Sequence, residues 1–454
     1  MMKIISKTRN IFSAVKPLYI LSKVFGIAHL RFKSSVVAPD NFKGSVGLKG
    51  STFGSCLYSL TILIILIIFH CVSLHLKIRN IYKRLKYTFI LTDSFNSVLT
   101  FATVFISIFQ VITFNRNKLL VIFSKLNKSD KFTLRYSESD VRYRKTYILF
   151  LLNIMFTALI FGFLCTYDVF SNFKENIIIS MTRYTSHVIR ILMNMQFVSF
   201  NLLIKHRFDL LNKQLLSVFG VRSERELENG ILDDISMACT RKYKNPPDYR
   251  NARFQKKNYT NWDEYYDFDK KLFCKESLMT DREYSLNASS ESQYMLIQLR
   301  INHNEICNIS RLVFSTYGVF TIFELLNIIA DIITVLYFSL DFVISESYIS
   351  LEKICWCSSW LLLHAAKLIG ITRSCQLLTT CGNHTSVLVG KLMLFSRPKS
   401  RNTMIQLQQF SHQLLHTNIN ASACDFLDLN NTLLGSVAKV AITYVIVLLL
   451  NQKI

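Results

Sequence analysis

The amino-acid sequence predicts an all-α membrane protein with seven transmembrane helices. Half of its 454 residues are hydrophobic and its mean hydropathy is +0.28, which is too apolar for a soluble protein of this length. Only 5 prolines and 13 glycines interrupt the chain, which favours long helices over a β-rich or loop-rich fold. Apolar stretches long enough to cross a bilayer occupy residues 54–76, 88–114, 146–170, 177–204, 310–345, 354–372 and 430–450.

Hydrophilic segments separate these spans and divide the chain into parts. The insert after the fourth span is nearly balanced in charge and rich in polar residues, which is typical of a partly disordered linker. The predicted parts are an N-terminal cytoplasmic segment (1–53), spans one to four (54–204), a long cytoplasmic loop (205–300), spans five and six with a cytoplasmic extension (301–372), a cytoplasmic helical segment (373–429) and the last span (430–454).

Several predicted spans carry ionisable residues. The second contains Asp93, and the fourth contains Arg183 and Arg190. Glu324 and Asp331 are two helical turns apart in the fifth span, so both lie on one face. Because a charge at membrane depth is costly, such groups turn toward a partner or toward water. Two interpretations are open: a structural ion pair with Arg183 or Arg190, or the lining of a ligand cavity or an ion path.

The distribution of lysine and arginine predicts an inverted orientation, with the N-terminus cytoplasmic and the C-terminus extracellular. Cytoplasmic connections are normally enriched in these residues. The N-terminal segment, the 115–145 loop and the 373–429 segment are basic, whereas the 171–176 and 341–353 connections are not. One basic cluster after the first span opposes this orientation, but the other basic segments together outweigh it. This cluster comprises Lys77, Arg79, Lys83, Arg84 and Lys86.

Composition and motif spacing exclude several function classes. The net charge of +23 comes from basic residues between apolar spans rather than from one patch, which argues against nucleic-acid binding. The 11 cysteines follow no metal-ligand spacing. His303 with Cys307, and His412 with His416, could share a helix face, but neither pair has a third ligand nearby, which favours packing roles. We therefore predict no enzyme, no metal and no cofactor.

The C-terminal region combines an amphipathic helix with a final apolar run. Phe410 and Leu414 share the apolar face of the first helix. After a short polar break, the run from Leu433 to Leu450 has the length of a bilayer span and only Lys439 is charged.

This region resembles the C-terminal signature of the insect gustatory receptor family. The departures are Asp425 in place of glycine, Lys439 in place of a small residue, and Leu450-Asn451 in place of Gln-Phe. Further resemblance at 16–26, 206–215, 303–318 and 375–392 extends the similarity over most of the chain. The signature residues in register are Phe410, Ser411, Gln413, Leu414, Leu415, His416, Ala423, Cys424, Phe426, Thr432, Leu433, Leu434, Thr443 and Tyr444.

The resemblance implies a gustatory receptor that acts as a ligand-gated, non-selective cation channel in the plasma membrane. It implies a homo- or hetero-tetramer with other gustatory receptors, embedded in membrane lipid, whose last helices surround the pore. A leucine ring at Leu450 could close such a pore by dewetting. Lys439 has two interpretations: it extends to the inner interface, or it alters permeation. The implied pore or gate positions are Lys439, Thr443, Tyr444, Val447, Leu450 and Asn451.

The resemblance also implies a small-molecule tastant bound within each subunit, near the outer half of the helices. Aromatic side chains with a few polar groups suit many small molecules. The same residue types also anchor helices at headgroup depth, so both roles stay open. The candidate ligand-pocket residues are Tyr167, Tyr184, Tyr337, Asp341, Trp356 and Trp360.

Three other functions are compatible with parts of the sequence. The first is an insect olfactory receptor of the same superfamily. The second is a G-protein-coupled receptor, but the Asn-Pro-x-x-Tyr pattern at 245–249 lies in a polar loop instead of ending the seventh helix. The third is a decayed receptor whose gate has drifted. The basic loops and the ordered C-terminal motif favour the gustatory interpretation.

Overall fold

The computed structural model describes residues 11–28, 31–33, 47–49, 53–84, 87–113, 118–136, 143–171, 177–232, 288–345, 351–395 and 401–452. Long helices account for most of them, as the scarcity of proline and glycine predicts. The long helices are α2 (Ile11–Val24), α3 (Phe53–Leu76), α4 (Tyr87–Ile112), α5 (Lys118–Tyr136), α6 (Tyr143–Ser171), α7 (Ile177–Val218), α10 (Ala288–Ser345), α11 (Leu351–Leu394), α12 (Arg401–His416) and α13 (Thr432–Gln452).

The remaining described elements are short. A π-helical turn, η1 (Lys77–Ile81), and a 3-10 turn, η2 (Tyr82–Arg84), follow α3. Strands β1 (Arg31–Lys33) and β2 (Gly47–Lys49) form one antiparallel pair, with Phe32 opposite Leu48. Strands β3 (Ser422–Ala423) and β4 (Leu427–Asp428) form a second antiparallel pair, with Ala423 opposite Leu427.

The chain folds into two compact units. The first comprises Met1–Leu211, Asn302–Thr385 and Thr417–Ile454, and the second comprises Asn212–Ile301 and Ser386–His416. Within the second unit, Lys391 forms ion pairs with Glu224 and Glu228, and Arg300 donates to Gln409. The residues discussed below as functional candidates belong to the first unit.

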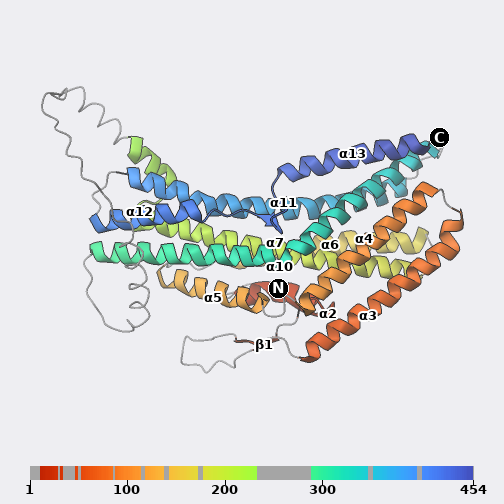
Figure 1. Ribbon diagram of the computed structural model, residues 1–454, viewed down its shortest axis with the longest axis horizontal. Helices are drawn as coiled ribbons and strands as arrows, with labels where there is room; N and C mark the ends of the chain where they lie inside the picture. The colour runs from red at the N-terminus through yellow and green to blue at the C-terminus, as the bar shows by residue number, and fades with distance from the viewer. Residues whose placement is uncertain are drawn as a thin grey trace. The chain divides into compact units, whose positions relative to one another are not determined.

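Each predicted span coincides with a helix over nearly all of its length, although the second span was predicted beyond the end of α4 at Ile112 and the seventh before the start of α13 at Thr432. The structure separates the spans into two groups. Among the described residues, five helical segments are long and apolar enough to cross a membrane: Phe53–Ile81, Phe89–Ile112, Ile177–Val218, Ser292–Leu340 and Leu351–Leu394. The third and seventh predicted spans contain shorter apolar helices, Ile154–Tyr167 and Thr432–Leu448. The C-terminal ends of α3, α6, α10 and α13 lie at one end of the first unit (Figure 1).

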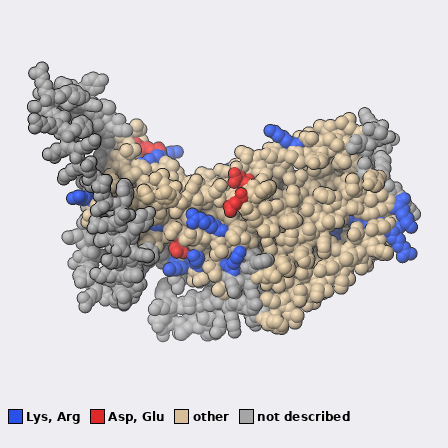
Figure 2. Space-filling view, viewed as in Figure 1, with Lys and Arg blue, Asp and Glu red and all other residues tan. Residues whose placement is uncertain are grey.

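Helix α7 is the most buried of the five long apolar segments. Its central position explains why the fourth predicted span is the most polar, because its polar side chains meet partners inside the bundle. Gln196, for example, donates to Ser22 on α2 at 2.7 Å and accepts from the hydroxyl of Tyr317 on α10 at 2.9 Å. The surface over α3, α4 and α13 is mostly uncharged on the face that Figure 2 shows.

A short hairpin joins α12 to α13. The amide of Phe426 donates to the carbonyl of Ala423, so the turn centres on Cys424 and Asp425. Both central residues have positive φ angles, of 53° and 56°, as in type I′ turns, where glycine is common. The hairpin lies against α10 at Gly318, where an added Cβ would come within 3.1 Å of the Cys424 amide nitrogen.

Part of the long loop lies outside the described residues. These are residues 233–287, which include the Asn-Pro-x-x-Tyr pattern and the sequons at Asn258 and Asn287. The predicted disorder of this loop stays a prediction. Both ends of the predicted loop are helical, since α7 extends to Val218 and α10 begins at Ala288.

The hairpin geometry generates a prediction about Asp425. A β-branched residue is strained at positive φ, whereas aspartate is tolerated and glycine is unstrained. We expect Asp425→Val to lower the free energy of unfolding by about 1–2 kcal/mol relative to Asp425→Gly. Thermal unfolding of the purified protein in detergent measures this difference. Equal stability of the two variants would contradict the left-handed conformation of this turn.

Candidate functional site

A buried arginine on α7 connects two carboxylates on α10. Arg190 Nε lies 2.7 Å from Glu324 Oε2, and its Nη2 atom lies 3.0 Å from Asp331 Oδ2. The Arg190 and Glu324 side chains have no exposed surface. The two-turn spacing of Glu324 and Asp331 places both carboxylates along one face of α10, where a single guanidinium reaches both. The predicted ion pair with Arg190 is therefore confirmed.

Helices α7 and α11 complete this network. Lys367 Nζ lies 2.9 Å from Glu324 Oε1, and the Asn194 amide donates to the same oxygen at 2.9 Å. His364 Nδ1 lies 3.3 Å from Asp331 Oδ2. Two basic residues, Arg190 and Lys367, thus balance two acidic ones. A balanced, hydrogen-bonded set can be held away from water, but removing one member leaves a buried charge without its partner.

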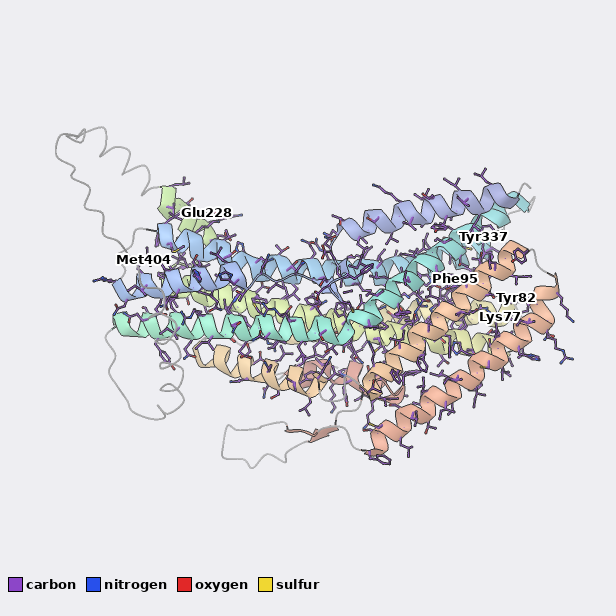
Figure 3. All side chains as sticks on the ribbon, viewed as in Figure 1. Lys77, Tyr82, Phe95, Glu228, Tyr337 and Met404 are labelled. Carbon is purple, nitrogen blue, oxygen red and sulfur yellow. The ribbon has the colours of Figure 1, made fainter. Side chains whose placement is uncertain are left out.

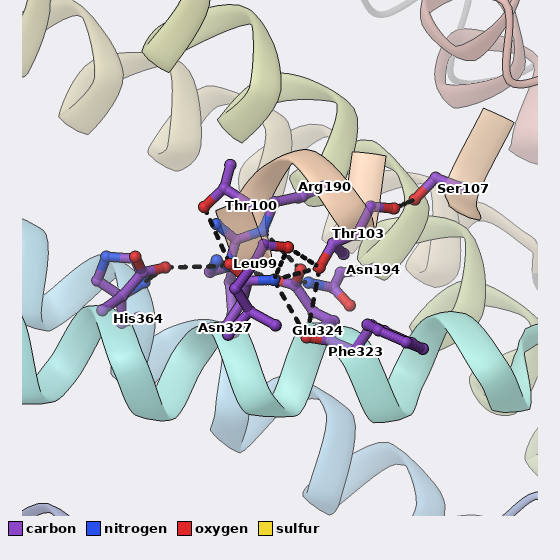
Figure 4. A network of polar contacts seen from close by, with 12 residues as sticks. Leu99, Thr100, Thr103, Ser107, Arg190, Asn194, Phe323, Glu324, Asn327 and His364 are labelled. Carbon is purple, nitrogen blue, oxygen red and sulfur yellow. Dashed lines mark hydrogen bonds and ion pairs between the residues drawn. The ribbon is translucent and has the colours of Figure 1, made fainter. Parts of the chain in front are cut away.

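Helix α4 joins the network through neutral side chains (Figure 4). The Asn96 amide donates to Asp331 Oδ1 at 2.9 Å. The Thr100 hydroxyl donates to Asn327 Oδ1 at 3.0 Å, and Asn327 donates to the Leu99 carbonyl at 3.0 Å. Polar contacts therefore connect α4, α7, α10 and α11, and a movement of one of these helices must rearrange bonds to the others.

A cavity of about 260 Å³ lies between α3, α4, α7 and α10. Asp331 belongs to both the cavity wall and the ion-pair network. Sequence analysis did not identify this cavity, although the polar positions 93, 96, 97 and 100 in the second span repeat at helical spacing and could have signalled it. Its polar lining includes His70, Ser73, Lys77, Asp93, Asn96, Ser97, Thr100, Thr182, Arg183, Ser186, His187 and Asp331.

An ion pair lines the cavity near the end of α3. Lys77 Nζ lies 2.8 Å from Asp93 Oδ2 and donates to Ser97 at 3.0 Å. The Tyr82 hydroxyl donates to the same Asp93 oxygen at 2.6 Å. Burial and this hydrogen bond raise the pKa of Tyr82 above its ordinary value, which keeps the phenol protonated. Figure 3 shows Lys77 and Tyr82 where α3 and α4 approach each other.

Four of the six predicted pocket residues form one aromatic cluster. The rings of Tyr184 and Trp360 stack with their centroids 6.4 Å apart. The ring centroid of Trp356 lies 6.4 Å from that of Trp360 and 6.1 Å from that of Tyr167. Trp360 is buried with apolar neighbours from α6, α7, α10 and α11. These side chains fill the space between the helices by packing against one another. They therefore form a wall rather than the lining of the polar cavity.

The other two predicted pocket residues lie apart from this cluster. Tyr337 is buried, and its ring lies 5.7 Å from that of Phe338. The side chain of Asp341 lies outside the described residues. His187 connects the cluster to the cavity, because its ring lies 4.8 Å from Trp360 while it also lines the cavity. A ligand that contacts His187 would therefore also influence the aromatic wall.

Most of the predicted pore residues lie away from the buried stripe of α13, whereas Tyr444 lies beside that stripe. Val437, Ala441 and Val445 are buried at successive turns of the helix. Val447 and Leu450 are 47% and 60% exposed, and Lys439 and Thr443 are also exposed. The side chain of Asn451 lies outside the described residues. At 3.6 residues per turn, Lys439, Thr443, Val447 and Leu450 form one stripe away from the buried one.

The pairs His303–Cys307 and His412–His416, which were predicted to have packing roles, lie on α10 and α12. His303 is buried beside the Cys307 thiol, at 3.6 Å, and its ring contacts Phe208. The rings of His412 and His416 lie 5.1 Å apart. Within the described part of the chain, no group of three histidine, cysteine, aspartate or glutamate side chains could hold a metal ion.

The ion-pair network predicts energetic coupling between Glu324 and Lys367. Glu324→Gln leaves Lys367 buried without its carboxylate, and we expect it to lower the free energy of unfolding by about 3–5 kcal/mol. Adding Lys367→Met removes the orphaned charge, so the double variant should recover about 1–3 kcal/mol relative to the sum of the single changes. A double-mutant cycle by thermal unfolding measures this coupling.

The pair formed by Lys391 and Glu228 is a matched control, because its carboxylate side chain is 48% exposed. Its coupling in the same kind of cycle should stay below about 1 kcal/mol. Additive effects of Glu324→Gln and Lys367→Met would show that the network does not act as a unit.

Comparisons with known proteins agree with this architecture. The pattern of the 7tm chemosensory receptor family matches residues 15–245 and 254–449. A stretch of 155 residues, 34% of this chain, is 23% identical to gustatory and pheromone receptor 32a of Drosophila melanogaster and spans only 30% of that receptor's length. The fold is similar to that of the insect olfactory receptor OR5 from Machilis hrabei, with a TM-score of 0.53 and 13% identity over 96% of this chain and 97% of OR5.

The structure of OR5 in complex with eugenol gives the same TM-score, at 12% identity over the same shares of both chains. At these identities the likeness concerns the fold. The family pattern, by contrast, covers nearly the whole sequence and describes receptors rather than enzymes. The chain belongs to the 7tm chemosensory receptor family and is a multi-pass membrane protein of the insect gustatory and olfactory receptor superfamily.

Proposed function

We propose that this protein is a gustatory receptor of the plasma membrane, a ligand-gated and non-selective cation channel opened by a small-molecule tastant. The observation that carries the channel proposal is the two-sided character of α13. Its buried stripe packs on the rest of the chain, while Val447 and Leu450 are exposed on the opposite side. In a homo- or hetero-tetramer with other gustatory receptors, four such stripes would face one another around a central pore.

The C-terminal signature supports a gustatory role. Thr443 and Tyr444 match its closing dipeptide, and a relative from Drosophila melanogaster is a gustatory and pheromone receptor. The olfactory alternative rests on the likeness to OR5, which has also been determined in complex with eugenol. The likeness to OR5 shows a shared fold only, whereas the C-terminal motif is a similarity in sequence to gustatory receptors. We therefore favour taste over olfaction.

We propose seven spans, with the N-terminus inside and the C-terminus outside. The basic N-terminal segment and the basic 115–145 and 373–429 segments support this orientation. In this orientation, the end of the first unit that carries the C-terminal ends of α3, α6, α10 and α13 faces outward. The cavity beside Lys77 and Asp93 then lies in the outer half of the helices, where a tastant arrives.

Glycosylation mapping in insect cells tests this orientation. The sequons at Asn258 and Asn287 should stay unmodified, because the long loop lies inside. A tag after Ile454 should be accessible to antibody on intact cells, and a tag before Met1 only after permeabilisation. Glycosylated Asn258 or Asn287 together with a hidden C-terminal tag would reverse the orientation and favour a G-protein-coupled receptor.

The proposed gate is a ring of Leu450 side chains, which closes the pore by excluding water. Leu450→Ser should stabilise a wetted pore and raise the ligand-independent cation current about tenfold at equal surface expression. Ile442→Ser is the control, because Ile442 is exposed on the flank of the proposed pore stripe. An equal rise in both variants, or a rise in neither, would remove Leu450 from the gate.

The exposed Lys439 side chain allows a test of the pore stripe. A ring of lysines in a cation pore repels permeant ions. If Lys439 faces the pore, Lys439→Gly should increase single-channel cation conductance severalfold. Unchanged conductance and selectivity would show that this side chain extends to the inner membrane interface instead. Single-channel recording from excised patches distinguishes the two placements.

A further inference from the structure

We propose that the outward face of α2 binds an anionic lipid of the cytoplasmic leaflet. This inference rests on the proposed orientation, which places the N-terminus, and therefore α2, on the inner side of the membrane. Lys16, Ile20 and Lys23 follow one another at four- and three-residue spacing in α2, so they share one face of the helix. All three side chains are exposed. These three residues form the basic stripe of α2.

The opposite face of α2 is fastened to the rest of the first unit. Leu18 and Ser22 are buried, and the Ser22 hydroxyl accepts from the Gln196 amide on α7 at 2.7 Å. At the end of the helix, the Tyr58 hydroxyl on α3 donates to the Val24 carbonyl at 2.7 Å. Helix α2 is therefore held against α3 and α7, and its basic stripe faces away from them.

The contact with α3 places the basic stripe at the depth of the membrane interface. Helix α3 begins at Phe53 and belongs to the least buried of the five long apolar segments, which leaves most of its surface for lipid. Tyr58 lies about 7–8 Å along the helix axis from Phe53, and one headgroup layer is about 5–8 Å thick. Lys23, which precedes Val24, therefore lies near the level at which the headgroups meet the hydrocarbon.

The charge of this region favours an anionic partner. The first 53 residues contain nine basic residues and one acidic residue, Asp40. Neither Lys16 nor Lys23 forms an ion pair with a residue that the structure describes. A lysine at the interface covers apolar surface with its methylene groups and reaches the headgroups with its ammonium group. Anionic lipids of the cytoplasmic leaflet attract basic segments at this depth.

Exposed apolar side chains beside the lysines favour a lipid over a soluble anion. Ile20 and Val24 are 50% and 57% exposed, and Leu57, which precedes Tyr58 on α3, is 53% exposed. A soluble phosphate compound would leave this apolar surface in contact with water, whereas the acyl chains of a lipid cover it. The combination of lysines and apolar side chains therefore fits a lipid molecule with a negatively charged headgroup.

A lipid on this face would stabilise the docked position of α2. Gln196 bonds both Ser22 of α2 and Tyr317 of α10, so one side chain links α2 to the helix that carries the buried carboxylates. Anionic lipid therefore favours the arrangement of α2, α7 and α10 that the structure shows.

Binding of short-chain lipids to the purified full-length protein in a neutral detergent tests the proposal. Dioctanoylphosphatidylserine is anionic, dioctanoylphosphatidylcholine has the same chains and no net charge, and glycerophosphoserine is the anionic headgroup without chains. We expect the phosphatidylserine to bind at least about tenfold more tightly than the phosphatidylcholine, with a difference that decreases at high salt. Equal affinities for the two lipids, or equally tight binding of glycerophosphoserine, would overturn the proposal.

Single substitutions locate the lipid on α2. Lys16→Gln and Lys23→Gln should each reduce the preference for phosphatidylserine about fivefold, the contribution of one basic residue near a membrane surface. Lys213→Gln is the matched control, because Lys213 is exposed on α7 beyond the predicted fourth span. Ile20→Ser should weaken the binding of both lipids and leave the preference unchanged. An effect of Lys213→Gln as large as that of the α2 variants would remove the lipid from the basic stripe.

The outcomes separate this inference from the proposed function. Phosphatidylserine binding without any ligand-evoked current would support the lipid surface and contradict the channel. Ligand-evoked currents in a protein without a preference for phosphatidylserine would support the channel and contradict the lipid surface. Tags that report the opposite orientation would contradict the assignment to the cytoplasmic leaflet.

Discussion

The buried guanidinium of Arg190 is the constraint on which the arrangement of the helices depends. It holds two carboxylates of α10 from the centre of α7, and Lys367 of α11 shares one of them. Charges at membrane depth persist only where geometry satisfies them. The rotation of α7 relative to α10 and α11 is therefore fixed by these contacts more than by apolar packing, which tolerates many rotations. Asn96 extends the same constraint to α4.

The cavity and the aromatic cluster lie next to this network and differ in packing and polarity. The cluster around Trp360 is packed and apolar, and it closes the bundle between α6, α7 and α11. The cavity is polar, and Asp331 joins it to the network. His187 contacts both. The polar cavity, the aromatic cluster and the charged helix junction therefore lie within one part of the chain, while α13 carries the proposed pore stripe.

The helices could be predicted from the sequence because long apolar runs without proline have one favourable structure in a membrane. The spacing of Glu324 and Asp331 also allowed an ion pair with Arg183 or Arg190 to be predicted, beside the alternative of a ligand cavity or an ion path. The choice of Arg190 over Arg183 was not determined, since it depends on how α7 is rotated. Depth and residue type selected Tyr184, Trp356 and Trp360 as pocket candidates. The structure brings their rings together, but residue type alone does not determine whether such rings line a space or fill it. The cavity could not be predicted, because the position of a gap between helices depends on how the helices pack and not on any residue motif.

We propose that this chain itself conducts cations. Reconstitution of the purified protein into planar lipid bilayers tests it most directly, because no other cellular protein is present. We expect unitary currents whose reversal potential in a salt gradient lies near the equilibrium potential of the cations rather than that of the anions. The Leu450→Ser channel should be open for a larger fraction of the time than the unmodified channel. A folded, oligomeric preparation in which neither protein passes current would contradict the account and leave the chain as a receptor that signals through a partner.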